Sequence, residues 1–183
     1  MNKTYLFLAD GFEDIEALAV VDILRRGGVE VLTVAIADSL DVTSAHGVVV
    51  KADTLLKEVL SAKAECLVFP GGMPGAEHLG NCKPLMEWMQ NHYEAGGYVA
   101  AICAAPAMVF SQLKAGRRLK LTSYPGFEQC LPEADVLADG VVVDGRVITG
   151  KGPGFAVPFG LGLLRELRSA EVADDVAAGM LLA

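Results

Sequence analysis

The residue best suited to nucleophilic chemistry is Cys103, in the stretch YVAAICAAPAMVF, residues 98 to 110. Ala101 and Ala105 lie two positions to either side, and a sharp strand-to-helix elbow requires small residues there. Pro106 suits the first turn of a following helix. At such an elbow the thiol faces unpaired amides and the positive end of a helix, which favours the thiolate. The alternative is an inert cysteine that packs like a small apolar residue.

A second unusual residue is Glu16, which shares one face of the expected helix 13–26 with Ala19, Val20 and Ile23. A charge on a packed face costs on the order of 1–3 kcal/mol even when partly compensated, so Glu16 needs a partner or a proton. If the strands preceding Glu16 and Cys103 are neighbours, acid and thiol meet at the end of the sheet. A protonated Glu16 is then a proton donor to sulfur. The alternative is a partly buried glutamate that is bonded to backbone.

A glycine-rich loop, PGGMPG, follows the apolar run CLVF. Gly71 and Gly72 allow the backbone to approach a ligand closely and to present N–H groups. Together with the amide of Ala104, they form a candidate oxyanion site beside the sulfur. An ordinary turn is the alternative, since paired glycines with proline favour turns as well.

The sequence gives no support for a metal or a cofactor. Three histidines precede the cysteine without metal-ligand spacing: His46, His78 and His92. Three further cysteines form neither a CxxC pair nor a zinc-like pattern: Cys66, Cys82 and Cys130. GRVITGKG resembles a phosphate-binding loop, but Gly152 occupies the position of the magnesium-binding Ser or Thr, and no G-x-G-x-x-G follows the first strand.

The elements that must position these residues alternate along the chain. Strands are expected at residues 4–9, 30–36, 48–51, 66–69, 98–102, 120–123, 141–144 and 147–149. Helices are expected at residues 13–26, 55–60, 84–95, 104–113, 155–167 and 170–181. This alternation predicts an α/β fold with a mostly parallel sheet and helices on both faces. Asp144-Gly145 favours a two-residue turn and hence a small β-hairpin.

Composition limits the classes of function. The net charge of −8 disfavours nucleic acid or an anionic membrane as a partner, and KAGRRLK is the local exception. The uncharged stretch 95–113 contains two glycines and a proline and is better explained by a strand and a helix than by a membrane span. The amino terminus has too few apolar residues for a signal peptide. We expect one domain over residues 1–183, cytoplasmic and with reduced thiols.

Five segments, taken in order, resemble the ThiJ/PfpI superfamily and within it the parkinsonism-associated deglycase branch. They are ADGFEDIEA, FPGGMPGAEHL, AAICAAPAMV, LTSYPG and VITGKGPG. The resemblance implies a flavodoxin-like three-layer sandwich that forms a homodimer through the first helix. It also implies a reactive Cys103 hydrogen-bonded by Glu16, with the amides of Gly72 and Ala104 as oxyanion donors.

Two substrate-binding candidates follow from the same resemblance. His46 falls where relatives often carry a basic residue that reaches across the dimer. Tyr124 in LTSYPG departs from the family, because several relatives place a histidine there. Since tyrosine is no base near neutral pH, this weakens a peptidase assignment and leaves the acid–base work to Glu16.

We therefore expect cofactor-free, cysteine-dependent chemistry on small reactive carbonyls or on glycated proteins and metabolites, of the glyoxalase III or deglycase type. In this hypothesis Cys103 is the nucleophile and Glu16 is the proton donor and acceptor. The alternative is a cysteine-based sensor of oxidative stress or a chaperone. A thiamine-related role has no supporting nucleotide or thiamine diphosphate motif.

Overall fold

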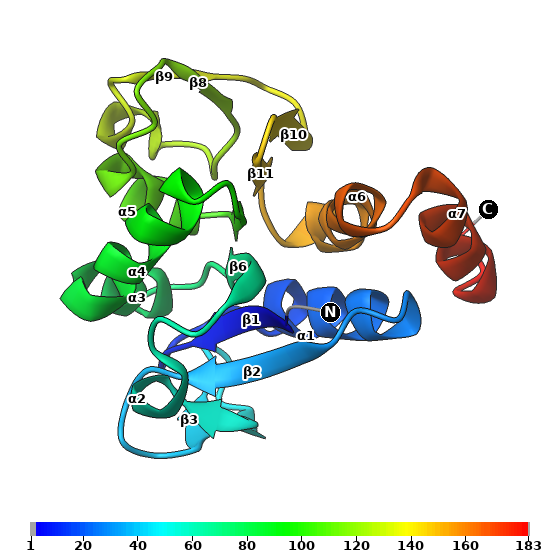
Figure 1. Ribbon diagram of the computed structural model, residues 1–183, viewed down its shortest axis with the longest axis horizontal. Coiled ribbons are helices and arrows are strands. Elements are labelled where there is room, and N and C mark those ends of the chain that lie inside the picture. Colours follow the sequence, from blue (N-terminus) through cyan, green and yellow to red (C-terminus); the bar gives the residue numbers. More distant parts are fainter. Residues whose placement is uncertain (1–2, 183) are drawn as a thin grey trace.

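A seven-stranded sheet forms the centre of the molecule in the computed structural model, which describes residues 3–182 (Figure 1). In spatial order its strands are β10 (Val141–Asp144), β11 (Val147–Gly150), β7 (Tyr98–Ile102), β6 (Ala64–Phe69), β1 (Lys3–Leu8), β2 (Val31–Ala35) and β5 (Thr54–Leu55). Neighbouring strands are parallel except for the antiparallel pair β10 and β11. The mostly parallel sheet and the small hairpin are therefore confirmed, but the two turn residues are Gly145 and Arg146, because Asp144 is the last paired residue of β10, opposite Val147.

Helices cover both faces of this sheet, as expected. They are α1 (Asp14–Arg26), α2 (Leu56–Val59), α3 (Gly75–Asn81), α4 (Lys83–Glu94), α5 (Ala105–Met108), α6 (Ala156–Leu167) and α7 (Ala170–Gly179), with short 3-10 turns η1 (Phe110–Gln112), η2 (Glu128–Cys130) and η3 (Pro153–Phe155). Figure 1 shows α1, α6 and α7 on one side of β6, and α3, α4 and α5 on the other. The result is the flavodoxin-like three-layer arrangement.

Aromatic side chains fasten α4 to the middle of the sheet. Phe7 of β1 stacks on Phe69 of β6 with ring centroids 5.2 Å apart. Trp88 of α4 lies 5.5 Å from Phe7 and 5.3 Å from Tyr5. Because Phe7 and Phe69 are fully buried, these contacts hold α4 against the two central strands, and the loops that follow these strands contribute to the candidate site.

Two expected strands lie outside the central sheet. The segment expected at 48–51 forms β4 (Val49–Lys51), which pairs with β3 (Asp41–Thr43) in a separate hairpin. The segment expected at 120–123 forms β8 (Leu119–Leu121), which pairs with β9 (Ala134–Val136) in a two-stranded ribbon. Each strand has only three residues and a nearby partner, so local pairing replaces entry into the large sheet.

Helical segments differ from the expectation in two places. The expected helix 104–113 divides into α5 and η1, where Gln112 N donates to Val109 O and Leu113 N donates to Phe110 O in the tighter i to i+3 pattern. Helix α3 was not expected, because its glycines weaken the helical signal. In α3, a Cβ on Gly80 would overlap the backbone of Met108, so this glycine permits close packing against α5.

The uncharged stretch 95–113 accordingly contains β7, α5 and η1. Among residues 3–182, no helix has both the length and the apolar character that a membrane crossing requires. Residues 1, 2 and 183, which belong to the expected domain and to its amino-terminal segment, lie outside the described part of the chain.

Candidate active site

Cys103 occupies a sharp elbow between β7 and α5. Its φ of 66° is in the left-handed region, which is uncommon for a residue other than glycine. Hydrogen bonds hold this conformation from both sides: Cys103 N donates to Gly150 O over 2.9 Å, and Tyr124 N donates to Cys103 O over 2.8 Å. The flanking residues Ala101 and Ala105 are fully buried, so larger side chains would have no room. The backbone therefore fixes the direction in which the side chain leaves the chain, and the residue is 8% exposed.

Glu16 lies beneath this elbow in the first turn of α1, and the residue is fully buried. Its Oε2 accepts a hydrogen bond of 2.8 Å from Gly71 N, so the bond to backbone that belonged to the alternative interpretation is present. A Cβ on Gly71 would lie 2.5 Å from the Cys103 Cβ and 2.6 Å from Glu16 Oε2. Both side chains therefore pack against the same side of Gly71, and only glycine fits between them.

The reason that acid and thiol meet differs from the one expected from the sequence. β1 and β7 are not neighbours, because β6 lies between them. The loop that follows β6 fills the interval and brings Gly71 to both side chains. All three strands are parallel, so the three loops leave the same end of the sheet, where ligands of such folds collect.

The glycine loop and the start of α1 are joined by several backbone contacts. Glu13 N donates to Gly71 O over 3.0 Å, while Glu13 Oε2 caps the helix by accepting from Glu16 N over 2.7 Å. Gly72 has a φ of 86°, and a Cβ there would overlap Glu13 N and Gly11 O. Sequence reasoning missed Glu13, although its spacing of three residues from Glu16 is typical of a helix cap.

The charge state of the pair is set by burial. Desolvation, reinforced by the charge of Glu13, raises the pKa of Glu16 to about 7, against the opposing effects of Cys103 and the Gly71 amide. Desolvation, then the charge and hydrogen bond of Glu16, raises the pKa of Cys103 to about 12, whereas the amides of Gly72 and Ala104 lower it.

These values correct the expectation that the amide dipoles around Cys103 determine the pKa of its thiol. Because each group opposes ionisation of the other, the pair releases its first proton near neutral pH and its second only under strongly basic conditions. The pKa of about 12 therefore describes the thiol beside an ionised Glu16. When Glu16 holds the remaining proton, that charge repulsion is absent and the amides of Gly72 and Ala104 face the sulfur. Glu16 Oε1, buried and without a hydrogen-bond partner among the described residues, is a place for this proton.

Tyr124 lies beside the elbow through its backbone, while its side chain is 46% exposed. Its ring packs against Gly152, where a Cβ would come within 3.3 Å, and lies edge-on to Phe127 at 6.4 Å between centroids. The ring therefore lies at the surface, and its role in substrate binding stays a prediction.

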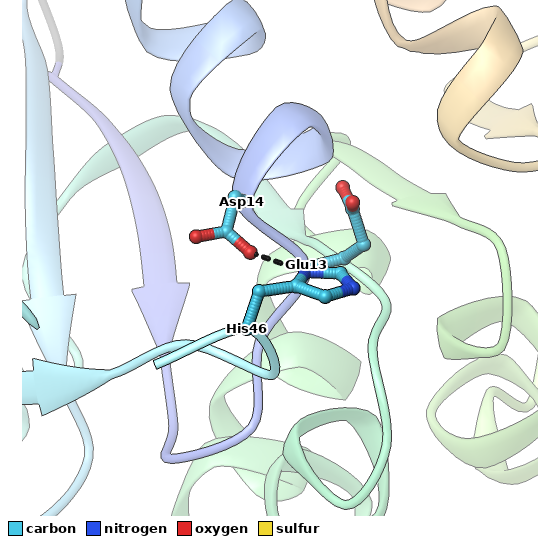
Figure 2. A group of neighbouring side chains, drawn as sticks. All are labelled: Glu13, Asp14 and His46. Atoms are coloured by element: carbon cyan, nitrogen blue, oxygen red, sulfur yellow. Dashed lines mark hydrogen bonds and ion pairs between the residues drawn. The ribbon is translucent and has the colours of Figure 1, made fainter. Parts of the chain in front are cut away.

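His46 lies in the loop between β3 and β4, with its side chain 69% exposed. Figure 2 shows it against the start of α1, where His46 Nδ1 and Asp14 Oδ2 are 2.8 Å apart. This hydrogen bond and the charge of Asp14 raise the pKa of His46. His78 and His92 bond instead to the backbone oxygens of Asp10 and Tyr98.

Glu13, Asp14 and His46 are the described residues best able to offer atoms to a metal, with those atoms within 4.8 Å of one another (Figure 2). Both carboxylates already accept hydrogen bonds, Asp14 from His46 and Glu13 from the backbone of Glu16. The positive end of α1 also opposes a cation there. The expectation of chemistry without a metal therefore remains a prediction.

A flavodoxin-like α/β sheet that carries a left-handed cysteine elbow over a buried glutamate defines a small class of proteins. The chain belongs to the DJ-1/PfpI family, whose model matches residues 2–166. It is 37% identical to Protein DJ-1 homolog A of Arabidopsis thaliana over 99% of this chain and 47% of that protein, and so spans about half of its length.

Two further relatives match over nearly their whole length. The Glutathione-independent glyoxalase DJR-1.2 of Caenorhabditis elegans is 32% identical over 93% of this chain and 91% of that protein. The solved structure of oxidized Toxoplasma gondii DJ-1 is 35% identical, covers 99% of this chain and 98% of that one, and superimposes with a TM-score of 0.93. The expected family and fold are thus confirmed.

Proposed function

We propose that the chain converts small 2-oxoaldehydes, such as methylglyoxal, into hydroxy acids without a cofactor. The observation that carries this proposal is the packing of the Glu16 carboxyl and the Cys103 side chain against one face of Gly71. A nucleophile, a proton carrier with a pKa of about 7 and converging amides are the groups that such a reaction needs. A relative that is named as a glyoxalase supports the same reaction class.

The reaction begins when the Cys103 sulfur, as thiolate, forms a bond to the aldehyde carbon. The carbonyl oxygen becomes an alkoxide that the amides of Gly72 and Ala104 hold, and it takes the proton of Glu16 to give a hemithioacetal, which leaves Glu16 as a carboxylate. This step requires Glu16 to be protonated, because a second charge beside the sulfur raises the pKa of the thiol.

Glu16 then moves one proton in each direction. Its carboxylate removes the hydrogen from the former aldehyde carbon to give an enediolate, and the proton of the hemithioacetal hydroxyl passes to the former ketone oxygen. The protonated acid then returns the hydrogen to the adjacent carbon, which leaves a thioester at the first carbon. The first carbon is thereby oxidised and the second reduced, so no external oxidant is needed. Water hydrolyses the resulting thioester, which releases lactate and the free thiol. In adducts of aldehydes with amines or thiols, on proteins or metabolites, Cys103 would react with the same carbon.

The test is lactate formation from methylglyoxal by the wild type, Cys103→Ser and Glu16→Gln. We expect both variants to lose at least about 100-fold in kcat/KM, the range for removal of a nucleophile or a general acid–base group. Cys66→Ser is the matched control, since Cys66 is fully buried in β6, away from the elbow. Equal lactate formation by wild type and Cys103→Ser would sink the proposal.

A second candidate function is oxidation sensing by the same cysteine. The supporting observation is that Cys103 retains 8% exposure and faces amides that stabilise an added oxygen anion, while Cys66 is fully buried. The solved relative from Toxoplasma gondii is described as oxidized. In this function, protonated Glu16 would donate a hydrogen bond to a sulfinate on Cys103.

We further propose that two copies of the chain pair through α1. Ile15 and Leu18, on the outer side of this helix, are 55% and 41% exposed. They lie one turn apart, so they form a continuous apolar strip along the surface. Burial of this strip in a dimer would remove it from water, and it would bring His46 close to the partner.

A further inference from the structure

A cavity of about 810 Å³ lies on the part of the molecule that carries β8 and β9. One wall is η1 with the loop that follows it, and the other is β8 with residues 130–134. Figure 1 shows the β8–β9 ribbon at the edge of the molecule, and β8 contacts β10 of the central sheet. The volume is within the range of about 300–1,000 Å³ that is usual for sites of small ligands. Neither Cys103 nor Glu16 lines this cavity.

The inner surface of the cavity is apolar. Its innermost side chains are aliphatic or aromatic and nearly or fully buried: Phe110, Leu113, Leu119, Leu121 and Leu131. Phe110 also packs edge-on against Phe69 at 6.1 Å, so this wall belongs to the main core and cannot readily collapse into the space. Such a surface favours a hydrocarbon or aryl group over a polar ligand.

The rim of the cavity is the one basic segment of a chain with a net charge of −8, and includes the KAGRRLK run. Arg117 and Arg118 are ion-paired, to Asp144 over 2.7 Å and to Asp135 over 2.5 Å. These pairs hold the β8–β9 ribbon in place and leave little free charge. Lys114 is exposed, and its ammonium has no ion pair within the described residues 3–182. Glu133 is the acidic residue on the rim.

From this combination we infer that the cavity binds a small amphipathic carboxylate, with its hydrocarbon part against the leucines and its carboxylate at Lys114. The apolar walls favour the hydrocarbon, and the lining residue Lys114, which has no ion pair among residues 3–182, favours the anionic group. Glu133 limits the site to one negative charge. The site is separate from the one proposed for aldehydes, and it requires no chemistry at Cys103.

The test is calorimetric titration of the full chain with octanoate, and with 1-octanol as the uncharged probe. Wild type should bind one octanoate with a Kd below about 1 mM, and should bind 1-octanol more weakly. Lys114→Glu should weaken octanoate at least about fivefold without weakening 1-octanol. Lys83→Glu makes the same charge change on an exposed lysine at the start of α4, outside the cavity, and should leave both affinities unchanged.

Two more variants locate the ligand. Ala115 lines the cavity, so Ala115→Trp should block both probes while circular dichroism shows a folded chain. Cys103→Ser should bind octanoate like the wild type. The inference is overturned by the absence of saturable octanoate binding, or by equal affinities of wild type and Lys114→Glu. Loss of binding in Cys103→Ser would also overturn it, because that result would place the ligand at the elbow.

Discussion

The carboxyl of Glu16 and the side chain of Cys103 meet on one side of Gly71, which has no side chain to separate them. Gly71 also donates its N–H to Glu16 Oε2 over 2.8 Å, and thereby fixes the orientation of the acid. Since both groups are buried in a shared space, the ionisation of each one depends on the other. The chemistry of the site therefore follows from the position of one proton.

The raised pKa of Glu16 predicts a loss of stability on alkalinisation. Glu16 has a pKa of about 7 in the folded chain, against an ordinary value of 4.5. The folded state thus retains a proton that the unfolded state has released, so stability is fully present below about pH 4.5 and falls as the pH rises to about 7. The contribution lost is about 3 kcal/mol. Urea unfolding across this window measures it.

Glu16→Gln is the control for that measurement, because glutamine does not titrate. The difference in unfolding free energy between wild type and Glu16→Gln should change by that amount between about pH 5 and about pH 8, in favour of the variant at the higher pH. A difference that is constant across the window would contradict the raised pKa.

Gly72→Ala tests how tightly the glycine loop packs on α1. The new Cβ would overlap backbone atoms of Glu13 and Gly11, and φ is 86°. We expect a loss of more than about 2 kcal/mol in unfolding free energy. Gly47 has a similar backbone conformation, with φ 83°, but a Cβ there would meet no atom within 4 Å. Gly47→Ala should therefore lower the unfolding free energy by only about 1 kcal/mol. Equal losses would mean that strain alone, without the overlap, determines the result.

Much of the arrangement could be predicted from local sequence, and the limits have a physical origin. Alternating strand and helix patterns predicted the parallel sheet, and the small residues around Cys103 predicted its elbow. Strand order depends on contacts between distant segments, so the sequence did not reveal that β6 separates β1 from β7. For the same reason, local sequence could not show that the segment 120–123 pairs with β9 and does not enter the main sheet.

Local sequence also could not predict how deeply the residues of the site are buried. Amides at the elbow predicted a thiolate, and they do lower the pKa of Cys103, but desolvation and Glu16 outweigh them. Helical spacing placed Glu16 on a packed face without giving the depth of that burial. Depth depends on Gly71 and on the loops around it, which only the assembled fold brings together.

Mild peroxide should oxidise Cys103 before the other thiols. Burial raises the pKa of Cys66 and removes it from solvent, while Cys82, the N-cap residue of α4, makes no side-chain capping hydrogen bond. Mass spectrometry of peptides should show two added oxygens on Cys103 first, and Glu16→Gln should slow that step. Uniform oxidation of the thiols would count against a sensing role.

The dimer proposal predicts that Ile15→Asp yields a monomer. The charge would enter the centre of the apolar strip on α1, and a buried charge without a partner costs several kcal/mol. Sedimentation velocity of wild type and variant measures the change in mass. Leu182→Asp is the control, since this 41% exposed leucine lies near the carboxyl-terminal end, after α7. A monomeric wild type would exclude the interface.

The most direct test of the shared proton is the rate of Cys103 alkylation by iodoacetamide as a function of pH, in wild type and Glu16→Gln. The pair that has lost one proton includes the tautomer in which Cys103 is the thiolate and Glu16 holds the remaining proton, so this reactive tautomer appears together with the first proton lost. In wild type the rate should therefore rise to a plateau near pH 7, and Glu16→Gln should lack this plateau. A wild-type thiol that titrates like free cysteine, near about 8.5, with the same profile in Glu16→Gln, would contradict the account.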